Sequence, residues 1–193
     1  TARDVALNDL NIALPGTNIA TGSNIIIDTT ARTITSITSS TANGSYKAGD
    51  NISIRINFSE QITLTGTMGI SLNSGGVCVI AGFTGTTTTG TYTVLAGHTS
   101  ADLTATSVLV NSTCRDVALN NLVTTLPATN IATGSNIIID TIGPVINSII
   151  SSTPNGSYKA GDNISIRINF SEQITLIGTM GINLDSGGVC VIA

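Results

Sequence analysis

Three kinds of side chain in this sequence could take part in chemistry: one histidine, three cysteines and eleven acidic residues. The histidine, His98, stands in Ala96-Gly97-His98-Thr99-Ser100, a composition typical of a turn. A Ser-His-Asp triad needs a histidine that is buried between an acid and a nucleophile. One histidine in a turn does not meet this requirement, and we therefore expect a protein that is not an enzyme.

The segments that must position these side chains follow a strand pattern. Between residues 51 and 58, the apolar residues Ile52, Ile54, Ile56 and Phe58 alternate with polar ones. This period of two predicts a β-strand with one face in a core and the other in solvent.

The chain repeats itself, with position 1 matching position 113, which is a period of 112. Residues 43 to 64 return unchanged at 155 to 176, and the match runs without a gap from 1–81 to 113–193, with 65 of 81 pairs identical. Periods of about 20 to 50 residues are typical of solenoids and propellers. The period found in this chain has the length of a whole domain, so we expect domains in tandem.

The repeat also indicates where one domain ends. Ile137-Ile138-Ile139-Asp140-Thr141 reads as a last strand that runs into a linker, and Gly143-Pro144 stops the pairing beyond it. We therefore predict a complete domain at 29–140. Residues 1–28 are then the C-terminal part of a preceding repeat, and 141–193 the N-terminal part of the next. Together these two pieces lack the counterpart of residues 82 to 112 and cannot rebuild a full domain.

The complete copy has the pattern of an all-β protein. About seven to nine short strands, separated by turns every eight to twelve residues, predict an antiparallel sandwich. The threonine-rich residues 85–90 are expected to form a loop or a weak edge. In the second copy, the alternating strand would expose Ile164, Ile166, Ile168 and Phe170 unless a neighbouring chain or further sequence of the same protein covers them.

A resemblance becomes specific at Asn43-Gly44-Ser45-Tyr46-Lys47-Ala48-Gly49-Asp50, which is followed by the alternating strand and Phe58-Ser59-Glu60. This stretch resembles the bacterial immunoglobulin-like repeats of large surface adhesins. Later features fit the same pattern: Tyr92–Gly97, Ser100–Leu103, Arg115–Asn120 and the linker Ile139-Asp140-Thr141. The resemblance implies immunoglobulin-like antiparallel β-sandwich repeats in tandem. It also implies an extracellular protein, at the cell surface or secreted, with an adhesive or structural role as a rod, and it does not imply a ligand.

An exported repeat of this kind lies in an oxidising compartment, where disulfides form. Cys78 and Cys114 lie in the same predicted domain, and a bridge between them would close a loop of 36 residues and stabilise by about 4 kcal/mol. Cys190 repeats Cys78, and its partner would lie outside this sequence. The alternative is that these cysteines are small buried thiols that act as hydrophobic residues.

Calcium often stiffens the junctions of such adhesin repeats, and Ca²⁺ prefers six to eight oxygen ligands. The candidates lie in the linkers, after the alternating strand and in the last third of the repeat: Asp28, Asp140, Glu60, Glu172, Asp116 and Asn120. The alternative is that Asp28 caps a turn and Glu60 ends a strand in solvent. Calcium is the one cofactor predicted, although eleven acidic residues are few for a calcium-loaded rod.

Composition limits the partners. A net charge of −4 with seven Lys and Arg offers no basic face for nucleic acid, and no apolar run approaches the ~20 residues of a membrane helix. Charged residues make up only 9% of the chain, so few charges guard the strand edges against pairing. The expected partners are therefore neighbouring repeats and further copies of the same protein.

Three functions remain open. In the first, the repeats are the stalk of an adhesin whose separate tip binds the target. In the second, they form a self-assembling extracellular filament or a surface-layer subunit. The third, a carbohydrate-binding module, would need exposed aromatic rings, and the sequence has only three Tyr and three Phe.

Overall fold

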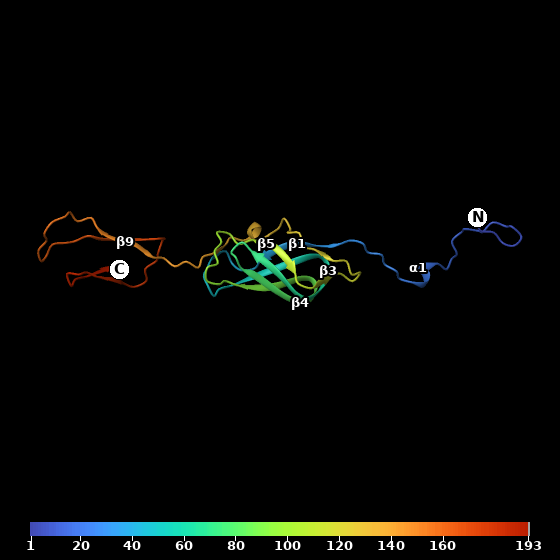
Figure 1. Ribbon diagram of the computed structural model, residues 1–193, viewed down its shortest axis with the longest axis horizontal. Coiled ribbons are helices and arrows are strands. Elements are labelled where there is room, and N and C mark those ends of the chain that lie inside the picture. The colour runs from blue at the N-terminus through green and yellow to red at the C-terminus, as the bar shows by residue number, and fades with distance from the viewer. Residues whose placement is uncertain (193) are drawn as a thin grey trace. The chain divides into compact units, whose positions relative to one another are not determined.

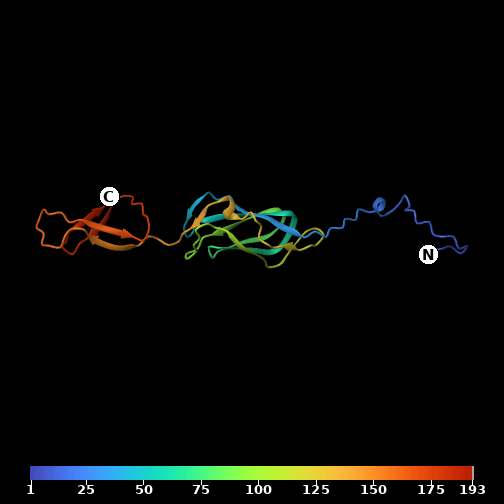
Figure 2. The same cartoon turned by 90° about the horizontal axis from the view of Figure 1, so that it is seen from above.

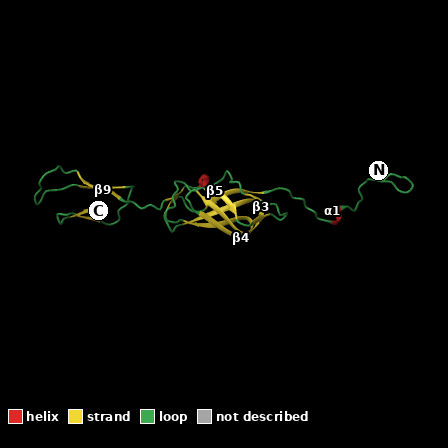
Figure 3. Cartoon of the chain, in the orientation of Figure 1, coloured by secondary structure: helices red, strands yellow, loops and turns green. Residues whose placement is uncertain are grey.

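The computed structural model describes residues 1–192, which fall into two units, 1–140 and 141–192 (Figure 1). Strands dominate both units, and the two helices are single turns, α1 (Ile19–Gly22) and α2 (Ile131–Gly134), red in Figure 3. The predicted all-β class is confirmed. In the described residues, no helix is long and apolar enough to cross a membrane.

The first unit contains eight strands: β1 (Arg32–Ser39), β2 (Gly44–Tyr46), β3 (Asn51–Leu72), β4 (Val77–Thr93), β5 (Ala105–Val110), β6 (Thr113–Arg115), β7 (Leu122–Val123) and β8 (Ile137–Ile139). The main sheet has the order β4-β3-β1-β7, and β5 and β6 pair with the second half of β3. Most pairs are antiparallel, as predicted. The β1–β7 and β2–β8 pairs are parallel, which the sequence pattern did not indicate.

The long hairpin of β3 and β4 organises this unit. Its register shifts between Asn57 and Ile62 and again between Leu64 and Thr67, with Gly66 at φ +83°. These irregularities bend the hairpin without ending its strands. From the sequence alone, the alternating segment 51–58, the pair Ile62 and Leu64, and the alternation over Met68, Ile70 and Leu72 are three short strands; in the structure all lie in β3. Of the two alternatives for residues 85–90, the loop was wrong, because these residues lie inside β4, and the edge holds, because in the described chain β4 pairs only with β3 and ends the sheet order.

The bent hairpin folds over itself around the core. A Cβ on Gly90 would lie 2.6 Å from Cys78 Sγ and 2.9 Å from Ile80 Cγ1, so the two halves of β4 face each other. Side chains at even positions point between these layers. They include the following residues, each at most 6% exposed: Ile52, Ile54, Ile56, Phe58, Ile62, Leu64, Met68, Ile70, Leu72, Cys78, Ile80, Tyr92 and Val94. The alternation read from the sequence is confirmed.

The chain enters and leaves this domain at opposite ends (Figures 1 and 2). Arg32, at the start of β1, contacts Glu60 of β3, whereas the amide of Asp140 donates to the carbonyl of Tyr46, near the start of β3. From Asn51 to Glu60, β3 covers ten residues, whose nine steps give roughly 30 Å of extended strand.

Residues 1–28 carry many exposed apolar side chains. Ile19, Ile25 and Ile27 are 72%, 67% and 85% exposed, whereas their counterparts Ile131, Ile137 and Ile139 are buried in the domain. The last strand predicted at Ile137-Ile138-Ile139 forms, as β8, whereas its identical copy at residues 25–27 does not form a strand. β8 pairs with β2, while Ile25-Ile26-Ile27 lies outside the strands of the described chain.

The second unit contains two separate hairpin sheets. β9 (Ile146–Ser151) pairs with β10 (Ile166–Phe170), and β11 (Met180–Asn183) pairs with β12 (Val189–Ile192). An open hollow of about 570 Å³ lies between apolar side chains that include Ile166, Phe170 and Met180. Ile164 is 45% exposed, and Ile166, Ile168 and Phe170 are half-buried. The apolar side chains of this unit are thus only partly covered; the hollow and the residues that line it are called the open half-core below.

Candidate functional site

Arg32 is the centre of the most unusual cluster in the domain. It stands two residues before Ile34 on β1 and therefore shares the inward face of the strand, and its side chain is only 5% exposed. Nη2 pairs with the carboxylate of Asp28, Nη1 lies 2.8 Å from Glu60 Oε1, and Nε lies 3.2 Å from Asp116 Oδ2. Three carboxylates therefore surround one buried guanidinium.

Asp116 is held by the loop that follows β6. Its Oδ1 accepts from the amide of Asn120, and its Oδ2 accepts from Asn120 Nδ2 at 3.0 Å. The same Nδ2 donates to the carbonyl of Asp28, at 3.1 Å. The loop needs a left-handed residue, Leu119 at φ 68°. Asn120 thus ties the linker to the domain, because it bonds both Asp28 and Asp116.

The same loop forms at the N-terminal end of the chain. There Asp4 accepts from the amide and from the side chain of Asn8, and Leu7 has φ 64°. Identical residues therefore fold locally into the same loop, even though residues 1–28 are exposed.

The charges of the cluster stabilise one another. Burial by itself raises the pKa of Asp116, but hydrogen bonds from Asn120 and the charge of Arg32 outweigh this effect, so its pKa is lowered. The pKa of Asp28 is lowered chiefly by the amide of Thr30 and then by Arg32. Burial lowers the pKa of Arg32, yet its carboxylate neighbours raise it overall. The guanidinium of Arg32 and the carboxylates of Asp28 and Asp116 stay charged at neutral pH.

Four of the six predicted calcium ligands meet here: Asp28, Glu60, Asp116 and Asn120. They do not fit calcium, because the Arg32 guanidinium already lies among the carboxylates and supplies the positive charge. The other two, Asp140 and Glu172, are exposed and lie outside the cluster. Among residues 1–192, no three His, Cys, Asp or Glu side chains are grouped so as to hold a metal ion. Calcium binding at Asp140 and Glu172 stays a prediction.

Sequence reasoning missed Arg32 itself. Two signals could have found it. A charged residue occupies an inward position of an alternating strand, and its counterpart in the second copy is Pro144, within residues 30–33, where all four positions differ between the copies.

His98 belongs to a buried polar network. Its Nδ1 lies 2.8 Å from the hydroxyl of Tyr92 and accepts from the amide of Leu95, and Tyr92 in turn bonds Ser74 Oγ at 2.9 Å. Tyr92 and Ser74 are 1% and 5% exposed. The network closes the β3–β4 turn against β4 and leaves Ser74 out of reach of a substrate. Phe58 and Tyr92 are both buried, so neither offers a ring face to a sugar.

The predicted disulfide was wrong. All three cysteines are free thiols, and no two lie at disulfide distance in the described chain. Cys78 pairs with Ile70 of β3 on one side, and Cys114 pairs with Leu64 on the other side. Six residues of β3 separate the two partners, roughly 20 Å of extended strand, far more than the span of a disulfide. Cys78 and Cys114 are instead buried hydrophobic residues, and Cys190 is half-buried.

Comparison with known protein families, curated proteins and solved structures finds no match for this chain.

Proposed function

We propose that this chain is a non-enzymatic structural or adhesive part of an extracellular bacterial surface protein, a rod or fibre of immunoglobulin-like domains in tandem. One observation carries the proposal: a domain that recurs along the sequence receives its chain at one end and releases it at the other. Domains connected in this way extend along a line.

The Arg32 cluster supports the same role. It binds Asp28, a linker residue just before the predicted domain, through Arg32 and Asn120, so the chain enters the domain in a fixed direction. At the corresponding place of the next repeat stands Pro144, and the ring of a proline restricts its own backbone φ to a narrow range. Each junction therefore has its own means of restricting the backbone.

The location on the cell tests this proposal. Gold-labelled antibodies raised against the purified chain should bind intact cells of the source organism. Labelling that requires permeabilised cells would overturn it. Electron microscopy of the purified chain should show isolated beads or beaded threads.

A self-assembling filament or surface-layer subunit is the second candidate. The exposed apolar residues of 1–28 and the open half-core of 141–192 favour it, because both surfaces are buried when their counterparts meet in the complete domain. Ordered fibres or tubes in the same micrographs would support this candidate over the first.

A further inference from the structure

The complete domain shows how its C-terminal segment, 113–140, closes its first half. In residues 29–140, β8 pairs in parallel with β2, and Ile131, Ile137 and Ile139 are buried, each at most 2% exposed. The amide of Ile37 donates to the carbonyl of Thr129, just before α2. All these hydrogen bonds join residues 113–140 to residues 29–81.

The two end pieces of the chain are copies of these two partners. Residues 1–28 match 113–140 at 22 of 28 positions, and residues 141–193 match 29–81 at 43 of 53. Thr17 and the whole stretch from Asn18 to Asp28 are identical to their counterparts. Each piece therefore keeps the side chains and amides that pair in the complete domain.

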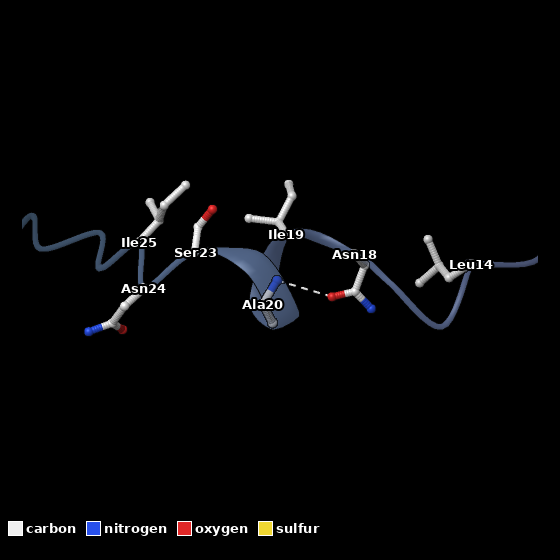
Figure 4. Close-up of a pocket in the computed structure, with 7 residues that line it drawn as sticks. All are labelled: Leu14, Asn18, Ile19, Ala20, Ser23, Asn24 and Ile25. Atoms are coloured by element: carbon white, nitrogen blue, oxygen red, sulfur yellow. Dashed lines mark hydrogen bonds between the residues drawn. The ribbon is translucent and has the colours of Figure 1, made fainter.

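The N-terminal piece presents its apolar side chains together. Leu14, Ile19 and Ile25 lie on the same side of the segment that contains α1, where they border an open hollow (Figure 4). Their counterparts Leu126, Ile131 and Ile137 pack on the core of the complete domain. Residues 1–28, called the donor segment below, thus carry these apolar side chains on one side.

The C-terminal unit presents the complementary face. Ile149 and Tyr158 are 48% and 46% exposed, whereas their counterparts Ile37 and Tyr46 are buried and half-buried. The apolar side chains that line the hollow of about 570 Å³ have counterparts that are at most 6% exposed, such as Ile54, Phe58 and Met68.

We propose that residues 1–28 of one copy of this chain dock onto residues 141–193 of a second copy, in the register that β8 and β2 hold in the complete domain. Ile25, Ile26 and Ile27 then lie beside Gly156, Ser157 and Tyr158. The occupant is a second copy because the linkers leave residues 29–140 at opposite ends, as described above. Docking covers residues 156–158, the counterpart of β2, and the face of residues 144–151, the counterpart of β1. It leaves open the places that Tyr92 and Leu103 fill in the complete domain, because neither residue has a counterpart in either piece.

This contact is heterologous, since donor and acceptor are different surfaces of the chain. Such contacts continue from copy to copy and produce linear polymers unless they close into a ring. The inference deepens the self-assembly candidate. Its failure leaves the rod proposal intact, because that proposal depends on residues 29–140 and on location at the cell surface.

The register can be tested by cross-linking between two singly substituted chains. Ile26→Cys and Ser157→Cys are placed in separate chains, both with Cys190→Ser to remove the half-buried thiol. Their counterparts Ile138 and Ser45 are direct neighbours whose side chains share the outer face. Oxidation of the mixture should give a dimer with a 26–157 disulfide, identified by peptide mapping. Val5→Cys is the control donor, since its counterpart Val117 stays 89% exposed in the domain.

Sedimentation gives the second readout. The unsubstituted chain should self-associate as its concentration rises, and Ile19→Asp with Ile25→Asp should abolish this without loss of strand signal, because both residues are exposed in the free segment. Leu7→Asp is the matched control, because its counterpart Leu119 stays 68% exposed. A 26–157 yield no higher than that of the Val5 control would overturn the proposal. A further preparation carries both Ile26→Cys and Ser157→Cys in one chain. A disulfide that forms only within this doubly substituted chain, and not between two singly substituted chains, would also overturn the proposal.

Discussion

Arg32 Nε lies 3.2 Å from Asp116 Oδ2, and the two side chains are 5% and 2% exposed. The contact is an ion pair whose angle does not make it a hydrogen bond, so charge rather than alignment holds it. Asp116 gains its aligned hydrogen bonds from Asn120 instead. A buried carboxylate in this setting depends on the cation beside it.

Arg32→Met should destabilise the domain strongly, because the substitution removes the cation and leaves Asp116 buried and charged. We expect the melting temperature in calorimetry to fall by roughly 5–10 °C. Glu60→Gln is the matched control. Glu60 is 54% exposed, and its loss should shift the melting temperature by no more than about 2 °C. Equal shifts for the two variants would contradict this account of the cluster.

The same cluster should make stability depend on acid. The pKa values of Asp28 and Asp116 in the folded domain lie below their ordinary value of 3.8. Their contribution is therefore complete above that pH and is lost as the pH falls through the lower, folded-state pKa. The urea midpoint should drop below about pH 4, and less so in Arg32→Met. The pKa of Asp50 is lowered chiefly by the Lys47 amide, so Asp50 contributes equally to the acid dependence of the unsubstituted chain and of Arg32→Met. Parallel pH profiles would show that Arg32 is not the cause.

Gly90→Ala should be destabilising although alanine is usually acceptable in a strand. The new Cβ would lie 2.6 Å from Cys78 Sγ, and such overpacking costs about 1–3 kcal/mol. Cys78→Ala removes the obstructing sulfur. In urea unfolding, the double variant should lose less stability than the sum of the two single variants. Additive losses would mean that the two halves of β4 do not meet at these residues.

Tyr92→Phe tests the polar network around the β3–β4 turn. It removes the hydroxyl that joins Ser74 to His98, and a buried hydrogen bond of this kind contributes about 1–2 kcal/mol. Thr91→Val, at the neighbouring exposed position, should change the unfolding free energy by less than about 0.5 kcal/mol. A Tyr92→Phe domain as stable as the Thr91→Val control would show that the network does not stabilise the fold.

Thiol labelling distinguishes free cysteines from a disulfide. Burial raises the pKa of Cys78 and of Cys114 to about 11, so neither should react quickly with a maleimide at about pH 8. The native chain should take up one label rapidly, at the half-buried Cys190. After unfolding without reductant it should take up three. A single label after unfolding would show that Cys78 and Cys114 are joined in a disulfide, against the free thiols of the structure.

Local patterns were sufficient to predict the class of fold and its core. The alternation of Ile52, Ile54, Ile56 and Phe58 depends only on the strand period, and it held in the structure. The length of β3 could not be read, because residues 59–61 interrupt the pattern as a bulge would and also as a loop would.

Contacts between distant residues were predictable only in part. The acidic residues near Asp28 were expected to share a cation, and three carboxylates do share one, but it is the guanidinium of Arg32. The pairing of Cys78 with Cys114 failed because it depends on which side of β3 each strand occupies. Local patterns do not contain that information.

The opposite exits of the domain determine how it responds to tension. Traction between Asp28 and Asp140 pulls β1 and β8 lengthwise, so their ladders to β3 and β2 resist in shear, with several hydrogen bonds strained at once. The ion pairs of Arg32 with Asp28 and Glu60 lie ahead of β1 in this path and are partly open to water. Under tension we expect these ion pairs to open before any strand slides, which lengthens the linker at this junction. The next junction, where Pro144 stands in the place of Arg32, lacks these pairs.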